Sequence, residues 1–185
     1  AIVARRSDKK VYDLTKAVSR DDLRVPRGDG MRWRVRSTGN PAFVEPIRKI
    51  VLEAIEIEMR TPRAHRESVD LMRIGARAVD ASPDGLELTG PMIEAGSAIG
   101  LITADSLADP SSSAFAQGLR MLRETYGSAP AFFWVVTLEN TRARQLEAGQ
   151  AYVRSNLAAT AAGLSVHPMS QSLQEYPEMA GPYAA

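Results

Sequence analysis

The sequence contains no cysteine and only two histidines, His65 and His167. Without cysteine there is no disulfide framework, no thiol nucleophile and no cysteine-based metal site. Two histidines in the whole chain do not favour a metal centre either, so no metal is expected.

Signs of a membrane or nucleic-acid partner are missing too. No apolar run reaches the roughly 18 residues that a membrane-spanning helix needs, so no membrane partner is expected. The 23 basic residues are matched by 22 acidic ones, for a net charge of +1, so no basic surplus is present for nucleic acid. No signal peptide is visible, and cytoplasm is the expected compartment. The chain begins Ala-Ile without Met, which suits a mature product or a piece of something longer.

Several catalytic motifs are absent as well. The sequence has no G-x-x-x-x-G-K, G-x-G-x-x-G, G-x-S-x-G or H-E-x-x-H pattern, so hydrolase and nucleotidase functions have no motif in support. Hydrophobic residues make up 44% and charged residues 24%, the profile of an ordinary globular protein. The length of 185 residues suits one well-filled domain spanning 1–185 better than two small ones.

The residues that are present predict a helix-rich α+β fold with few strands. Apolar periodicity predicts helices over 41–61 and 113–127, and a more polar helix from Arg63 that closes at Gly75. Alternation predicts a strand over 32–36, and a β-branched and aromatic run predicts one over 131–139 that is buried on both faces. Other positions are assigned by composition: Trp33 and Trp134 to the core, Glu53, Glu56, Glu58 and His65 to solvent, and 177–185 to a loosely ordered tail.

The chain is organised around the stretch from Asn140 to Met179. Asn140 or Thr141 can cap a long helix, and Gly163 can end it in a left-handed conformation. We expect one continuous apolar stripe along this helix, and its many small neighbours indicate a central position in the fold. The stripe consists of Leu146, Gly149, Val153, Leu157, Ala161 and Leu164.

The first candidate site lies near the N-terminus, where Arg5, Arg6, Ser7 and Lys9 place three cations and a hydroxyl within five residues. Such groups bind phosphate monoesters through charge-assisted hydrogen bonds worth roughly 1.5–3 kcal/mol each. From composition alone, a solvated basic segment is the stronger interpretation.

The second candidate site follows the long helix and consists of His167, Pro168, Met169, Ser170 and Gln171. An apolar residue beside proline, followed by hydroxyl and amide groups, could contact a planar ligand and hydrogen-bond its edge. Taken alone, this segment is better explained as a loop in which Ser170 caps a short helix.

Together the two segments resemble a known family. The opening ARRSDKKVYD is similar to flavin-dependent nitroreductases, in which an R-R-S-x-R/K segment binds the phosphate of FMN. The strand FFWVVT, a helix rich in Ala and Gly, and the pattern A-A-G-L-x-x-x-P-M resemble the nitroreductase core, most closely its Acg-like branch, whose chains carry two halves. The resemblance covers residues 1–24 loosely and 129–179 well.

The resemblance implies a nitroreductase-like fold, with helices around a small mixed β-sheet and a long central helix. It implies that Arg5, Arg6, Ser7 and Lys9 hold the phosphate and ribityl oxygens of FMN. Four further residues would line the flavin ring: Pro168, Met169, Ser170 and Gln171. The implied activity is hydride transfer from NAD(P)H through the flavin to a nitro or quinone acceptor, in a homodimer or with a second half.

The sequence departs from the family in two places. The usual P-S-x-x-N-x-Q-P-W segment is replaced by VPRGDGMRW, which keeps the Trp but has no Asn. The closing strand of the family and its second group of basic residues on the phosphate side are also missing. Two alternatives therefore stay open: a catalytically degenerate domain that binds or sequesters flavin, and a generic helical interaction domain. The sequence names neither the acceptor nor the preferred nicotinamide.

Overall fold

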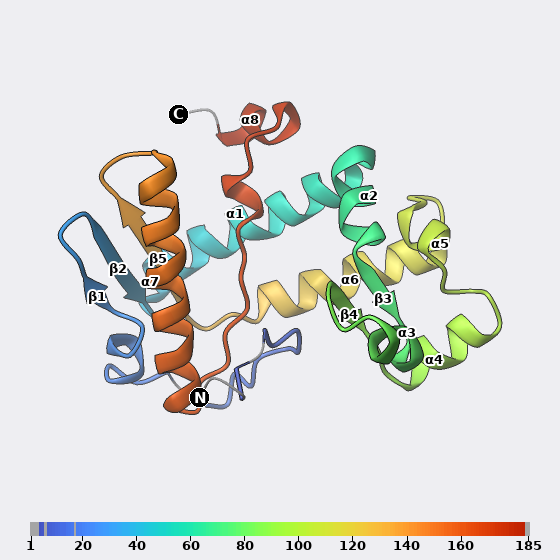
Figure 1. The fold of residues 1–185 in the computed structure, drawn as a ribbon, viewed down its shortest axis with the longest axis horizontal. Coiled ribbons are helices and arrows are strands. Elements are labelled where there is room, and N and C mark those ends of the chain that lie inside the picture. Colours follow the sequence, from blue (N-terminus) through green and yellow to red (C-terminus); the bar gives the residue numbers. More distant parts are fainter. Residues whose placement is uncertain (1–3, 6, 17, 184–185) are drawn as a thin grey trace. The chain divides into compact units, whose positions relative to one another are not determined.

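The computed structural model describes residues 4–5, 7–16 and 18–183, with only the backbone of 181–183 (Figure 1). These residues form an α+β fold in which helices outweigh strands, as predicted. The chain divides into two compact units. The first unit is Ala1–Val51 with Thr125–Met169, and the second is Leu52–Glu124 with Ser170–Ala185.

Two long helices agree closely with the sequence prediction. Helix α1 spans Pro41–Arg60 and helix α6 spans Ser113–Gly127. Each carries apolar residues at helical spacing, which fixes both its length and its buried face. Proline at the first position of α1 suits a helix start, because that residue needs no intrahelical N–H donor.

The first unit is built on a small antiparallel sheet with strand order β1-β2-β5. Helix α7 runs alongside β2 and β5 and contacts both (Figure 1). The bounds of these elements are η1 Asp22–Arg24, β1 Gly28–Asp29, β2 Trp33–Thr38, β5 Phe132–Thr137 and α7 Arg142–Ala161.

Strand β5 is half-buried, so the prediction of a strand buried on both faces was wrong. Val35 of β2 is opposite Val135, and Phe133 stacks on Tyr152 of α7 with ring centroids 6.1 Å apart. The alternate residue Trp134 points to the other face and is 41% exposed. Since successive side chains of a strand point to opposite faces, one helix covers only one of them. The assignment of Trp134 to the core was therefore also wrong.

Helix α7 buries a different face from the predicted stripe. Leu146 is 57% exposed and Val153 is 49% exposed. Two positions along a helix turn the side chain by about 200°, so the face through Ala151 and Ala159 lies opposite the one through Val153. The buried residues are Ala151, Ser155, Asn156 and Ala159.

A polar residue, Ser155, belongs to this buried face because the structure satisfies its hydroxyl. The hydroxyl donates to the carbonyl of Pro26 at 2.8 Å and lies 3.0 Å from that of Ala151. A buried hydroxyl with such partners loses little on leaving water. Small side chains let the helix lie close to the sheet, as its many small residues indicated, although the buried face is not the predicted apolar stripe.

Both predicted ends of α7 are confirmed. The side chain of Thr141 accepts the N–H of Arg144 at 3.4 Å. Gly163 has φ +75°, and the N–H of Leu164 donates to the carbonyl of Ala159 at 2.9 Å. This is the glycine-terminated C-cap that satisfies the last carbonyl groups of a helix.

The second unit holds mostly short elements and a parallel pair of strands. The family resemblance implied one small mixed sheet, whereas the described strands divide between an antiparallel sheet and this separate pair. The remaining bounds are α2 Pro62–Asp70, β3 Met72–Ile74, α3 Ala76–Ala81, β4 Leu86–Leu88, α4 Pro91–Ala98, α5 Ala104–Ala108, η2 Gln171–Leu173 and α8 Pro177–Tyr183.

Two boundary predictions in this unit were wrong. The predicted helix up to Gly75 ends at Asp70, because residues 72–74 pair with β4 instead. The predicted loose tail contains α8, whose Met179 is buried. In both cases a contact distant in sequence outweighs the local composition.

His65 and Glu58 are buried, although both were assigned to solvent. His65 is 5% exposed; its Nε2 lies 2.8 Å from the carbonyl oxygen of Leu107, and its ring meets Phe115 edge-on at 5.3 Å. The packing of α2 on α5 causes this burial. Glu58 is 8% exposed and accepts a hydrogen bond from Ser68 at 3.2 Å.

Candidate functional site

The first unit brings the N-terminal segment and the arm after α7 together. Ser7 and Val166 form a parallel β-bridge, and the N–H of Asp8 donates to the carbonyl of Val166 at 3.0 Å. The bridge lies two residues before Pro168. Both predicted clusters therefore contribute residues to one unit: Arg5, Ser7 and Lys9 from the start of the chain, and Pro168 and Met169 from the arm.

The side chains of the N-terminal cluster face solvent. Arg5, Ser7 and Lys9 are all exposed, and Arg5 has no ion pair within the described residues. Pro168 is exposed and Met169 is half-buried. Arg6 lies outside the described residues. The exposed cations and hydroxyl are thus placed where an anion from solution can reach them.

Buried hydroxyl groups hold the backbone of this segment. Thr125 donates to the carbonyl of Lys9 at 3.1 Å, and the N–H of Tyr12 donates to the hydroxyl of Ser128 at 2.9 Å. Thr125 and Ser128 are both buried at the end of α6. The segment from Ser7 to Tyr12 is therefore fixed at several points, which lowers the entropy that a bound anion would have to overcome.

An aromatic cluster lies between the segment and the arm. The ring of His167 meets Tyr126 edge-on with centroids 5.1 Å apart. Burial, followed by the charge of Lys9, lowers the pKa of His167 from its ordinary value of 6.5, while Asp8 opposes the shift. Burial, followed by the charge of Asp8, raises the pKa of Tyr12 to about 12. A backbone hydrogen bond with His167 opposes this shift by lowering the pKa.

His167 carries a buried polar atom that lacks a partner. Its Nδ1 has no hydrogen-bond partner among the described residues, although it is shielded from solvent. Because the lowered pKa keeps the imidazole neutral near pH 7, one ring nitrogen is an acceptor and the other a donor. The residue next to Pro168 can thus offer a hydrogen bond to a ligand.

Ser170 and Gln171 belong to the second unit. Ser170 is exposed and precedes η2, without the predicted capping bond from its side chain. Gln171 is half-buried, and its side chain lies close enough to the carboxyl group of Glu58 to lower the pKa of that group, against the larger effect of burial. That amide is therefore already engaged within its own unit.

Sequence reasoning missed Asp8 and Tyr12 as parts of this site, and it grouped His167 with Pro168 to Gln171 without giving the imidazole a role. The backbone of Tyr12 is held by Ser128 and the ring of His167 contacts Tyr126, and both partners are distant in sequence. The available signal was composition: His167 is one of the two histidines of the chain and lies directly beside the predicted ring-binding segment.

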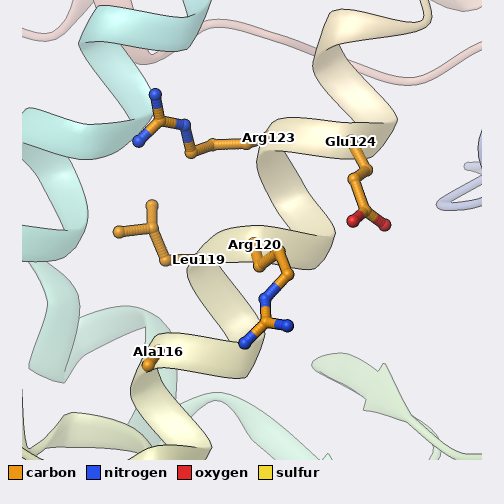
Figure 2. A pocket seen from close by; sticks show the side chains of 5 residues that line it. All are labelled: Ala116, Leu119, Arg120, Arg123 and Glu124. Carbon is orange, nitrogen blue, oxygen red and sulfur yellow. The ribbon is translucent and has the colours of Figure 1, made fainter.

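A cavity of about 440 Å³ lies on the surface of α6, in the second unit. Figure 2 shows Leu119 and Arg123 on one side of this helix and Glu124 on the other. Arg123 forms an ion pair with Glu56 at 3.1 Å, and the same carboxylate also pairs with Arg60 at 3.0 Å. The cavity contains none of the predicted site residues.

Comparisons with known protein families, with curated proteins and with solved structures found no match to this chain. In the part of the chain that the structure describes, no three His, Cys, Asp or Glu side chains gather as a metal site. Among the same residues, no helix is both long enough and apolar enough to cross a lipid bilayer.

Proposed function

We propose that this chain is an FMN-binding oxidoreductase of the nitroreductase type. It passes hydride from NAD(P)H through the flavin to a nitro or quinone acceptor, in the cytoplasm, with a second copy or second half completing the site. The proposal includes a nitroreductase-like arrangement of the core. The observation that carries it is the bridge between Ser7 and Val166, which brings the cationic segment to the arm that leads into Pro168.

The phosphate end of the ligand is assigned to Arg5, Arg6, Ser7 and Lys9. Of these, Arg5, Ser7 and Lys9 expose a guanidinium, a hydroxyl and an ammonium group on a backbone held by Thr125 and Ser128. A phosphate monoester suits such donors, since each charge-assisted hydrogen bond contributes about 1.5–3 kcal/mol.

The ring end is assigned to Pro168 and Met169, with Ser170 and Gln171 carried over from the family resemblance. Met169 is half-buried and offers a polarizable apolar surface, which suits a planar ring. The unpartnered Nδ1 of His167 supports a polar ligand beside them. Gln171 is the weakest member, because its amide already contacts Glu58.

When bound, FMN would supply the redox chemistry, so no side-chain nucleophile or metal is required. The residues of this chain would bind and orient the cofactor and exclude water from one side of it. A neutral His167 would add a hydrogen bond without adding a positive charge beside the ring.

The direct test is to add FMN to the purified chain, remove free flavin by gel filtration and record the visible spectrum. We expect bound flavin, which then bleaches when NADPH is added without oxygen. Loss of all flavin on the column would overturn the proposal. Flavin that is retained but never bleached would favour the alternative, a domain that sequesters flavin without turnover.

Matched variants test the phosphate assignment. Arg5→Ala and Arg6→Ala should each weaken FMN binding by about tenfold or more, which corresponds to the loss of one charge-assisted hydrogen bond. Lys49→Ala is the control, because Lys49 is an exposed cation on α1 in the same unit. His65→Ala is unsuitable as a control, since His65 is buried and its loss would disturb the fold. Equal affinities for the Arg and Lys49 variants would contradict the assignment.

A further inference from the structure

The second unit contains a buried polar cluster around Glu58, near the end of α1. Its Oε1 accepts a hydrogen bond from Ser68 on α2 at 3.2 Å. The side-chain amides of Gln171 and Gln174 reach the same carboxyl group, and His65 faces it from α2. Burial is the largest effect on this group and raises the pKa of Glu58.

Three oxygen atoms here are buried without a partner among the described residues: Glu58 Oε2, Gln171 Oε1 and Tyr176 Oη. Tyr176 belongs to the cluster because it lies close enough to Glu58 for that charge, after burial, to raise the pKa of its phenol. No other buried side-chain nitrogen or oxygen in the described part of the second unit lacks one. Each such atom has given up its hydrogen bonds to water without replacement, which is unfavourable for the folded state. Their concentration in one place indicates a site that a ligand completes.

A groove adjoins the cluster and shares two of its residues. It encloses about 490 Å³, and Gln174 and Tyr176 contribute to its wall. The remaining lining residues are Ser172, Leu173, Glu175, Pro177, Met179 and Ala180. Leu173, Pro177 and Met179 give one part of the wall an apolar character, so the groove suits the carbon skeleton of a small molecule.

The unpartnered atoms define the chemistry of the ligand. A carboxylate oxygen and an amide oxygen only accept hydrogen bonds, and the phenol can accept as well. A buried carboxylate also calls for a positive charge. Arg63 does not provide it, because it pairs with Glu178 through two contacts of 2.6 and 2.5 Å while its guanidinium carbon lies 5.8 Å from the Tyr176 ring centroid.

We propose that this cluster binds the primary ammonium group of a small amine, with the apolar part of the amine in the adjoining groove. The ammonium has three N–H donors for three acceptor oxygens, and its charge matches that of Glu58. This inference does not depend on flavin binding, because it rests on contacts within the second unit. Gln171 is common to both assignments and is therefore left unchanged in the test.

The test is calorimetric titration of the full chain, without FMN, with n-butylammonium and benzylammonium. Benzyl alcohol serves as the neutral probe of similar shape. We expect at least one amine to bind and the alcohol to bind at least about tenfold more weakly, since it lacks the charge. No heat from either amine, or equal affinity for benzylammonium and benzyl alcohol, overturns the proposal.

Variants locate the site. Glu58→Gln should weaken amine binding by about tenfold or more, and Tyr176→Phe should weaken it to a smaller extent. Glu67→Gln is the matched control, because it removes the same charge from an exposed position on α2 outside the groove lining. If Glu58→Gln binds the amine as tightly as the control does, the site is not at Glu58. Should Glu58→Gln fail to fold by circular dichroism, the comparison of Tyr176→Phe with Glu67→Gln decides, and equal affinities again overturn the proposal.

Discussion

Asp8 donates its backbone N–H to the carbonyl of Val166 at 3.0 Å, next to the bridge between Ser7 and Val166. This contact joins the start of the chain to the arm that follows α7. It is the link on which the proposed cofactor site depends, because the cationic side chains flank one strand of the bridge and Pro168 follows the other.

Replacing Asp8 by proline removes that N–H donor. We expect Asp8→Pro to lower the free energy of unfolding by about 1–3 kcal/mol, because it removes two hydrogen bonds: this one and the one from the N–H of Lys10 to the Asp8 carboxylate. It should also weaken FMN binding, because the segment loses its attachment to the arm. Urea denaturation and FMN titration measure the two effects.

Asp8→Asn is the control for this change, since it keeps the backbone donor. It also keeps an oxygen that can accept the N–H of Lys10, as Asp8 does at 3.0 Å. If the Pro and Asn variants are equally stable, the bridge contributes nothing measurable to the fold.

Stability at mildly acidic pH should depend on His167. Its pKa is lowered in the folded chain, chiefly by burial, so between that value and 6.5 the unfolded chain binds a proton that the folded chain does not. Stability therefore falls as pH falls through 6.5. In His167→Phe, which keeps a ring against Tyr126, urea denaturation at about pH 8 and about pH 5 should show a smaller loss. An equal loss in both proteins would exclude His167 as the cause.

Tyr12 predicts a second dependence, at alkaline pH. Its pKa is raised from 10.0 to about 12, so the folded chain keeps a proton that the unfolded chain releases. The contribution of Tyr12 to the free energy of unfolding is fully present below 10.0, the pKa of tyrosine in the unfolded chain. It is lost as pH rises from 10.0 toward about 12. Tyr12→Phe should lose less stability over that range in urea titrations. In an absorbance titration of tyrosinate, Tyr12 should ionise in a separate step near pH 12, and this step should be absent from Tyr12→Phe. If the step remained in the variant, it would belong to another tyrosine.

The two faces of α7 should respond in opposite directions to added side-chain volume. A Cβ at Gly149 meets no atom within 4 Å, so Gly149→Ala should stabilise the chain by about 0.5–1 kcal/mol through helix propensity. Ala159 is buried, so Ala159→Leu should destabilise it by about 1–3 kcal/mol through overpacking. Thermal denaturation measures both changes. If Gly149→Ala destabilised the chain and Ala159→Leu stabilised it, the buried face of α7 would be the predicted apolar stripe.

Local signals in the sequence determined much of this protein. Regular apolar spacing gave the extents of α1 and α6, and the cap at Thr141 and the left-handed Gly163 gave the ends of α7. The α+β class followed from the same patterns. Each of these features depends on residues within a few positions of one another, so a single stretch of sequence contains the information.

The predicted site was only partly accessible in this way. Side-chain chemistry and a family resemblance singled out Arg5, Ser7 and Lys9 together with Pro168 and Met169. Only the fold places these residues in one unit and adds Tyr12 and His167 beside them. The cofactor itself and the activity stay predictions.

Tertiary structure alone decided which surfaces are buried. Ala159 is buried and Val153 exposed because a sheet lies against one side of α7, a fact that the sequence of the helix does not contain. His65 and Glu58 are buried for the same reason, since α5 and other segments distant in the chain cover them. Burial is a property of neighbours in space, whereas helix limits and caps depend on neighbours in sequence.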